Sequence, residues 1–179
     1  KVFLNTEATP ELIEASYPDV VIACTGSRPD LPPIPGIEGS NVMLAANAFV
    51  NRETVGKKVV VVGAGDTGCE CALHLAEIGR DVTLVEMDEF IARRTGYTQR
   101  IVLVEKIETN EHISCITKLL QTGGDRGVTV ETPEGERFLE ADTIVVALGT
   151  RALQDEAEAF RDCAPTFWLA GDCRRRPEK

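Results

Sequence analysis

The stretch that decides the fold is VVVVGAGDTGCE, residues 59–70. Four consecutive valines are typical of a buried parallel strand, and the glycines after them have the spacing G-x-G-x-x-G at Gly63, Gly65 and Gly68. With this spacing the first glycine permits a tight turn, the second lets a pyrophosphate approach the backbone, and the third lets a helix pack against the strand. The sequence therefore predicts a strand and a helix joined by a dinucleotide-binding turn.

The residues that follow complete the unit. Helical spacing of apolar residues runs from Asp66 to Ile78, Gly79 is a stop signal, and VTLVE at 82–86 has the composition of a second strand. Together they predict one right-handed βαβ unit. We expect N–H groups of the turn and the positive end of the helix dipole to face the pyrophosphate. The cofactor-binding residues predicted at the turn are Gly63, Ala64, Gly65, Asp66, Thr67 and Gly68.

Asp66 and Thr67 open the predicted helix. An acidic residue at a helix start is a good N-cap, and this is our first interpretation of Asp66. Asp66 also lies where the phosphates should come. Thr67 would then offer its N–H group to the pyrophosphate.

Glu86 ends the second predicted strand. A carboxylate at this place can accept hydrogen bonds from both hydroxyls of a ribose and would repel a 2′-phosphate, which favours NAD(H) over NADP(H). Arg93 and Arg94 follow closely and could bind such a phosphate instead. An ordinary strand-to-helix turn without a ligand is the remaining alternative.

The rest of the chain predicts further strands and helices. Continuous apolar runs at 19–24 and 143–148 predict strands buried on both faces, and 166–170 predicts another strand. Alternating segments separated by the turn signals GGDR and PEGE predict an antiparallel meander. These segments are 113–121, 127–132 and 137–139. Helices are expected at 45–52 and 97–109, and the proline-rich residues 29–35 form a connector. The predicted fold class is α/β, a Rossmann-like three-layer parallel sheet with an antiparallel β-meander.

Two segments share one layout, DVVIACTGSRP at 19–29 and DTIVVALGTRA at 142–152. Each is an apolar strand that leads into a glycine turn. Ligands of open α/β sheets lie beyond the carboxyl ends of the strands, so both turns are candidate ligand edges. An ordinary turn from a strand into a loop, without a ligand, explains the pattern equally well.

Composition excludes several classes of function. The 29 acidic and 19 basic residues leave a net charge of −10, which disfavours binding to nucleic acid and to anionic membranes. The six cysteines are dispersed without a C-x-x-C pair, so we expect neither a metal site nor a redox dithiol of that type. We expect these cysteines to be reduced thiols in a cytoplasmic protein. We expect structural or solvated roles for His74 and His112, and name no catalytic residue.

The order of TGSRPDLPPIPG, VVVVGAGDTGCE, VTLVE, the meander, TIVVALGT and AGDCRRRP resembles the pyridine nucleotide–disulfide reductase superfamily. Within it, the AGDCRRRP ending is most similar to the carboxyl-terminal part of the NADH:flavin oxidoreductase group, which includes 2,4-dienoyl-CoA reductase and trimethylamine dehydrogenase. The resemblance implies an NAD(H)-binding domain at 39–149, inserted between partial FAD-domain segments at 1–38 and 150–179.

The resemblance also implies further site residues. Glu70 would lie near the nicotinamide, although a helix-start acid is an equal interpretation. The turns Thr25-Gly26 and Leu148-Gly149 would lie beside the cofactors. Asp172 would hold the ribitol or diphosphate end of FAD.

The chain departs from the superfamily in lacking the FAD domain's own first glycine turn, so its FAD site is incomplete. It starts at Lys1 and ends on RRRPEK directly after an apolar run, and we expect a fragment of a larger enzyme, inactive alone. The upstream flavin domain, and a barrel domain of the same polypeptide, would be its partners. The expected activity is hydride transfer from NADH to FAD or FMN. The alternatives are a non-catalytic module that holds ADP or a dinucleotide and, less favoured, a methyltransferase.

Overall fold

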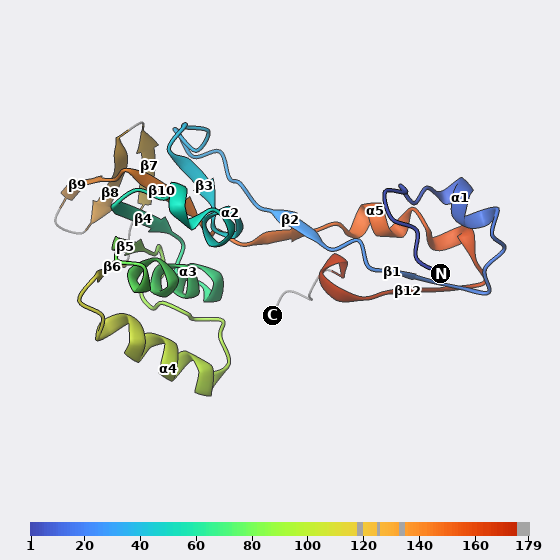
Figure 1. Ribbon diagram of the computed structural model, residues 1–179. Helices are drawn as coiled ribbons and strands as arrows, with labels where there is room; N and C mark the ends of the chain where they lie inside the picture. Colours follow the sequence, from blue (N-terminus) through green and yellow to red (C-terminus); the bar gives the residue numbers. More distant parts are fainter. Residues whose placement is uncertain (118–119, 125, 133–134, 175–179) are drawn as a thin grey trace. The chain divides into compact units, whose positions relative to one another are not determined.

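The computed structural model describes residues 1–117, 120–124, 126–132 and 135–174, with only the backbone for 120–124 (Figure 1). The described chain divides into two compact units, one of residues 1–29 with 150 onward and one of residues 30–149. Residues 30–38, expected with the first segment, belong to the second unit.

A parallel sheet forms the centre of the second unit. Among the described residues it has five strands in the order β3-β10-β4-β5-β6, and every neighbouring pair is parallel. The strands are β3 Val42–Leu44, β10 Thr143–Val146, β4 Lys58–Val62, β5 Asp81–Val85 and β6 Ile113–Ile116. The predicted α/β, Rossmann-like fold is confirmed.

Alternate valines of β4 point to opposite faces of this sheet, and each face has its own cover. Val59 and Val61 pack with the helices α2 (Ala45–Val50), α3 (Asp66–Glu77) and α4 (Tyr97–Glu108). Val60 and Val62 pack with Val128 and other residues of the meander. The four-valine run is therefore buried on both faces, as predicted, and the unit has three layers (Figure 1).

The meander comprises β7 Leu120–Gly124, β8 Gly127–Thr132 and β9 Gly135–Glu140, paired antiparallel in the described part of the chain. The prediction of one meander strand at 113–121 is wrong. Residues 113–116 form β6 and join the parallel sheet beside β5, whereas the meander begins at Leu120. Alternation of side chains is common to both kinds of strand, so the pattern could not separate them.

Helix α3 ends close to the predicted stop. Gly79 has a φ of +78° and donates its N–H to Ala76 O at 2.8 Å, and Arg80 N–H donates to Leu75 O at 3.0 Å. This pair of bonds is the Schellman arrangement, in which glycine accommodates the left-handed conformation. Helix α4 confirms the helix predicted at 97–109 to within one residue, and the short helix predicted at 45–52 divides into α2 and a 3-10 turn at Arg52–Thr54.

The first unit is smaller. Strand β1 (Val20–Ala23) pairs parallel with β12 (Thr166–Leu169), and β2 (Ser27–Pro29) pairs antiparallel with β11 (Thr150–Ala152). The remaining elements are α1 Pro10–Glu14, α5 Gln154–Glu158 and the 3-10 turns Arg161–Cys163 and Gly171–Cys173. Pro29, the first residue of the predicted proline-rich connector, is the last residue of β2 and pairs with Thr150 of β11.

Burial of β1 on both faces was predicted and is wrong. Val20 is 50% exposed and Ile22 is 61% exposed, and Trp168 on β12 is 63% exposed. Ala23 packs with Phe167, Leu169 and Cys173 on the other face. The sheet is covered on one face only within the described chain, which leaves the opposite apolar face open to solvent.

No helix among the described residues is both long enough and apolar enough to cross a membrane.

Candidate functional site

The three glycines of the turn after β4 meet different surroundings. A Cβ atom on Gly63 would lie 2.6 Å from Ala147 O, and one on Gly68 would lie 1.8 Å from Gly63 O. These two positions exclude side chains because the backbone itself is too close, and Gly63 also has a φ of +95°. A Cβ on Gly65 would meet nothing within 4 Å, and the φ of Gly65 is −70°. The chain itself therefore does not require glycine at position 65, and the space beside it is open to a ligand.

Helix α3 starts at this open space. Its cap residue is Gly65 and no side chain caps it, so the N–H groups of the first turn stay available to an external acceptor. The first backbone bond of the turn runs from Cys69 N–H to Gly65 O at 3.0 Å. An anion placed here would meet free N–H groups and the positive end of the helix dipole.

Asp66 does not cap the helix, which corrects our first interpretation of it. Its carboxylate accepts a hydrogen bond from the hydroxyl of Thr95, a residue that is only 9% exposed. An N-cap residue lies one position before the first helical residue, and that position belongs to Gly65. Thr67 is exposed on the first turn of α3.

Glu86 lies beside the glycine turn, as its place at the end of β5 predicts. Its Oε2 accepts a hydrogen bond from Ala64 N–H at 2.7 Å, and its Oε1 accepts one from Asp88 N–H at 3.0 Å. A carboxylate has about four lone-pair positions, so acceptor capacity remains for ribose hydroxyls. Glu86 thus fastens the turn to the end of β5, which the sequence did not indicate.

The segment 86–96, which we call the strap, is fastened to the turn at a second point. Ala92 N–H donates to Ala64 O at 2.7 Å, and the Cys69 thiol donates to the same oxygen at 3.4 Å. Ala92 is fully buried and has a φ of +51°. No sequence signal marked Ala92 or Thr95, because neither residue type indicates a ligand site.

Arg93 and Arg94 on the strap are exposed. Arg93 forms an ion pair with Asp88, with Nη1 3.2 Å from Oδ1. Because Arg93 is already paired with Asp88, the structure does not support the alternative in which Arg93 binds a 2′-phosphate.

The carboxyl end of β10 lies against the turn. Ala147 N–H donates to Val62 O at 2.8 Å, and a Cβ on Gly63 would lie 3.3 Å from Leu148 Cδ2. Gly149 follows with a φ of +97° and is exposed. The structure therefore brings the predicted pair Leu148-Gly149 to the edge that carries the glycine turn and Glu86.

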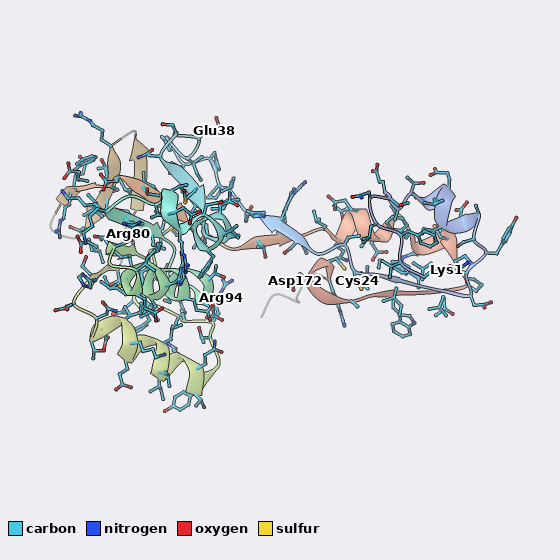
Figure 2. The ribbon with its side chains drawn as sticks, viewed as in Figure 1. Lys1, Cys24, Glu38, Arg80, Arg94 and Asp172 are labelled. Carbon is cyan, nitrogen blue, oxygen red and sulfur yellow. The ribbon has the colours of Figure 1, made fainter. Side chains whose placement is uncertain are left out.

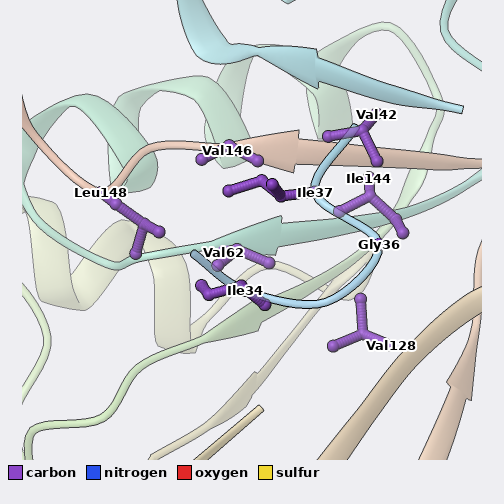
Figure 3. A pocket seen from close by; sticks show the side chains of 9 residues that line it. All are labelled: Ile34, Gly36, Ile37, Val42, Val62, Val128, Ile144, Val146 and Leu148. Carbon is purple, nitrogen blue, oxygen red and sulfur yellow. The ribbon is translucent and has the colours of Figure 1, made fainter. Parts of the chain in front are cut away.

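An apolar cavity of about 20 Å³ lies on the meander face of the sheet (Figure 3). Its lining is apolar throughout, and its volume is about that of one water molecule. It is a gap in the packing and has no capacity for a cofactor. The lining residues are Ile34, Gly36, Ile37, Val42, Val62, Val128, Ile144, Val146 and Leu148.

The other predicted site residues are placed as follows. Glu70 is exposed on α3. Thr25, Gly26 and Asp172 belong to the first unit, where the Thr25 hydroxyl donates to Leu153 O at 3.1 Å and Gly26 has a φ of +80°. Asp172 is exposed in the turn Gly171–Cys173 (Figure 2).

Neither histidine lies at the turn, and the cysteines are free thiols. His74 packs on the Phe49 ring, with ring centroids 5.3 Å apart, and His112 Nδ1 lies 3.2 Å from Asp81 Oδ1. Burial raises the pKa of the Cys69 thiol to about 12. Among the described residues no three His, Cys, Asp or Glu side chains gather as a metal site.

Known proteins resemble this chain along nearly its full length. The chain is 34% identical over 180 residues to bilirubin reductase of Mediterraneibacter gnavus (strain CC55_001C), covering 97% of the chain and 27% of the relative. It is 37% identical over 155 residues to NADH oxidase of Thermoanaerobacter brockii, covering 83% of the chain and 24% of the relative. The structure of a 2-naphthoyl-CoA reductase complex superposes with a TM-score of 0.85 at 30% identity, covering 97% of this chain and 27% of that one.

The chain spans about a quarter of the length of these relatives. The family described as pyridine nucleotide-disulphide oxidoreductase matches residues 1–162, which include the whole second unit with its glycine turn and most of the first unit. This family implies binding of FAD and NAD(P)H, and the open space beside Gly65 fits the pyrophosphate of such a cofactor. The chain therefore belongs to the pyridine nucleotide-disulphide oxidoreductase family.

Proposed function

We propose that the chain is the NAD(H)-binding portion of a larger flavin-dependent oxidoreductase. The observation that carries this proposal is the turn itself, in which Gly63 and Gly68 are required by packing but Gly65 faces open space. A glycine that the chain's own packing does not require is expected where a ligand approaches the backbone. The family match supports a dinucleotide as that ligand.

The residues of the second unit have separate tasks in this proposal. The turn from Gly63 to Gly68 binds the pyrophosphate through N–H groups, and Glu86 accepts the hydroxyls of the adenosine ribose with its remaining lone pairs. Leu148 and Gly149 border the same edge. Glu70 is assigned to the nicotinamide side by resemblance alone.

When bound, NADH would supply the hydride that reduces a flavin, FAD or FMN, of the larger enzyme. The protein's part is to hold the cofactor in position and to exclude water, so no acid or base of this chain is required. Thr25, Gly26 and Asp172 are proposed to contact FAD from the first unit. Residues 1–38 and 150–179 were expected to be FAD-domain segments. The compact unit of residues 1–29 with 150 onward supports a separate pair of segments, with the first boundary at Asp30 and not at Gly39.

The proposed partner is a flavin domain of the same polypeptide, with a barrel domain beyond it. Two observations support such a partner, namely the chain's share of about a quarter of its relatives and the open apolar face of β1 and β12. We also propose membership of the group of 2,4-dienoyl-CoA reductase, which the likeness to bilirubin reductase and 2-naphthoyl-CoA reductase supports. The free thiols are consistent with a cytoplasmic protein.

Calorimetric titration of the chain with NADH, NADPH, ADP and FAD tests the proposal. We expect NADH to bind much more tightly than ADP and more tightly than NADPH. Equal affinities for ADP and NADH would instead support a module that only holds the adenine half. NADPH as the tighter ligand would overturn the assignment of NAD(H).

Replacing Glu86 by Gln tests the choice between the two nucleotides. Gln keeps an acceptor for Ala64 N–H but removes the charge that repels a 2′-phosphate, so the ratio of NADPH affinity to NADH affinity should rise by about tenfold, or roughly 1–2 kcal/mol. Glu77→Gln, at an exposed position at the far end of α3, is the control for a general loss of charge. An unchanged ratio in the Glu86 variant would remove this carboxylate from the ribose site.

A further inference from the structure

The start of α3 presents an electrostatic problem that the proposed function does not resolve. Asp66 follows Gly65 directly, so a carboxylate lies one residue from the N–H groups proposed to take the pyrophosphate. A negative charge there stabilises the helix dipole in the free chain and opposes an anionic ligand. Among the described residues no cation pairs with Asp66 to offset this repulsion.

Thr95 determines where that charge lies. Its hydroxyl donates to Asp66 Oδ1 and thereby holds the carboxylate against the strap. Gly65, in contrast, faces open space. The carboxylate is therefore bound to the strap, whereas the space beside Gly65 is free of protein atoms.

The strap holds the Thr95 hydroxyl in place. Thr95 is 9% exposed, and its N–H donates to Ala92 O at 3.1 Å. Ala92, which is fully buried, donates in turn to Ala64 O at 2.7 Å. These two bonds link the backbone of Thr95 to the backbone of the glycine turn.

We propose that Thr95 is a positioning residue of the dinucleotide site, which holds the Asp66 carboxylate away from the pyrophosphate. This inference rests on the proposed function, because it needs an anionic ligand at the turn. It adds that Thr95, a strap residue that does not touch the ligand, affects the affinity through electrostatics.

A double-mutant cycle with NADH as the titrant tests the proposal. Thr95→Val frees the carboxylate and should weaken NADH roughly three- to tenfold, the effect of moving a unit charge by a few ångström near solvent. Asp66→Asn alone should change the NADH affinity less than this, because Thr95 already holds the carboxylate away from the ligand. In the Asp66→Asn/Thr95→Val double variant, the loss caused by Thr95→Val should disappear, because no charge remains to be positioned.

Two controls separate positioning from general structure. Thr95→Ser keeps the hydroxyl and should bind NADH like the unsubstituted chain, and Thr98→Val makes the same change at an exposed position of α4. The loss in Thr95→Val should also shrink at high ionic strength, because salt screens the repulsion. A purely structural effect of the lost hydroxyl would not depend on salt.

The outcomes are distinct. Equal losses from Thr95→Val with and without the Asp66 charge would overturn the inference and leave the proposed function standing. If Thr95→Val does not fold, Thr95→Ala takes its place in the cycle, with the same expected loss of NADH affinity and the same disappearance of that loss when Asp66→Asn is added. Absence of NADH binding by the unsubstituted chain overturns both.

Discussion

Burial controls the chemistry of the cysteines beneath the glycine turn. Cys69 and Cys71 lie two residues apart on α3 and are both fully buried. Desolvation raises the pKa of the Cys69 thiol to about 12 and that of the Cys71 thiol to about 11. Both thiols therefore stay protonated at neutral pH and are poor nucleophiles.

Thiol labelling checks this conclusion. At about pH 8 we expect an aromatic disulfide reagent to modify the exposed Cys24 promptly and to reach Cys69 and Cys71 only when denaturant unfolds the chain. Peptide mapping after timed quenching distinguishes the sites. Fast labelling of Cys69 in the folded chain would contradict the buried position of this side chain on α3.

Asp81, at the start of β5, is a second residue whose surroundings predict a measurable effect. Its pKa is lowered because Lys57, 3.3 Å away, and His112, 3.2 Å away, both favour the charged carboxylate. A folded pKa below the unfolded value adds stability above the unfolded pKa, and this stability is lost as the pH falls through the folded pKa.

Asp81→Asn should therefore lower the free energy of unfolding near neutral pH, and the difference from the unsubstituted chain should vanish in acid. Chemical denaturation at several pH values measures it. Asp19→Asn, at an exposed position, is the control. A difference that is independent of pH would show that the Asp81 carboxylate contributes by packing and not by charge.

At the scale of elements, two glycines where β4, α3 and β10 meet have different tasks. Gly68 is needed for packing, whereas Gly65 is open to a ligand. Gly68→Ala would place a Cβ 1.8 Å from Gly63 O, a backbone atom that cannot move without displacing β4. We expect this variant to lose at least about 2 kcal/mol of stability or not to fold. Circular dichroism during thermal unfolding provides the measurement.

Gly65→Ala is the matched partner of that variant. The new methyl group meets no protein atom within 4 Å, so the loss of stability should stay within about 1 kcal/mol. NADH binding should nevertheless fall sharply, because the methyl group occupies the space where a pyrophosphate would approach. Normal NADH affinity in this variant would place the ligand elsewhere.

At the scale of the whole molecule, the open apolar face of the first unit has its own consequence. Val20, Ile22 and Trp168 expose large side chains on one face of the β1-β12 sheet. Contiguous exposed apolar surface of this kind marks an interaction site. Trp168 is the one tryptophan of the sequence, so its fluorescence reports on this face directly.

We expect acrylamide to quench Trp168 in the chain alone almost as effectively as a free indole. Adding the proposed flavin domain, produced as part of a longer polypeptide, should shift the emission to the blue and protect it from quenching. Efficient quenching in the longer polypeptide would mean that some other surface meets that domain.

Many features of the fold followed from local pattern. The run of valines, the glycine spacing and the stop at Gly79 predicted β4, the turn, α3 and β5 nearly to the residue, because each depends on neighbours in the chain. Two predictions failed where the pattern was ambiguous. Residues 113–121 contain parts of two sheets, and β1 lacks the cover that its apolar composition predicts.

The sequence by itself determined the βαβ unit and the positions of Gly65 and Glu86 at its turn, since steric limits and strand order place them there. Only the tertiary structure decided what Asp66 does. Its partner Thr95 lies 29 residues away and reaches it because the strap folds back over Ala64. No periodicity records such a contact, because the course of an irregular loop is set by the hydrogen bonds it finds in the folded chain.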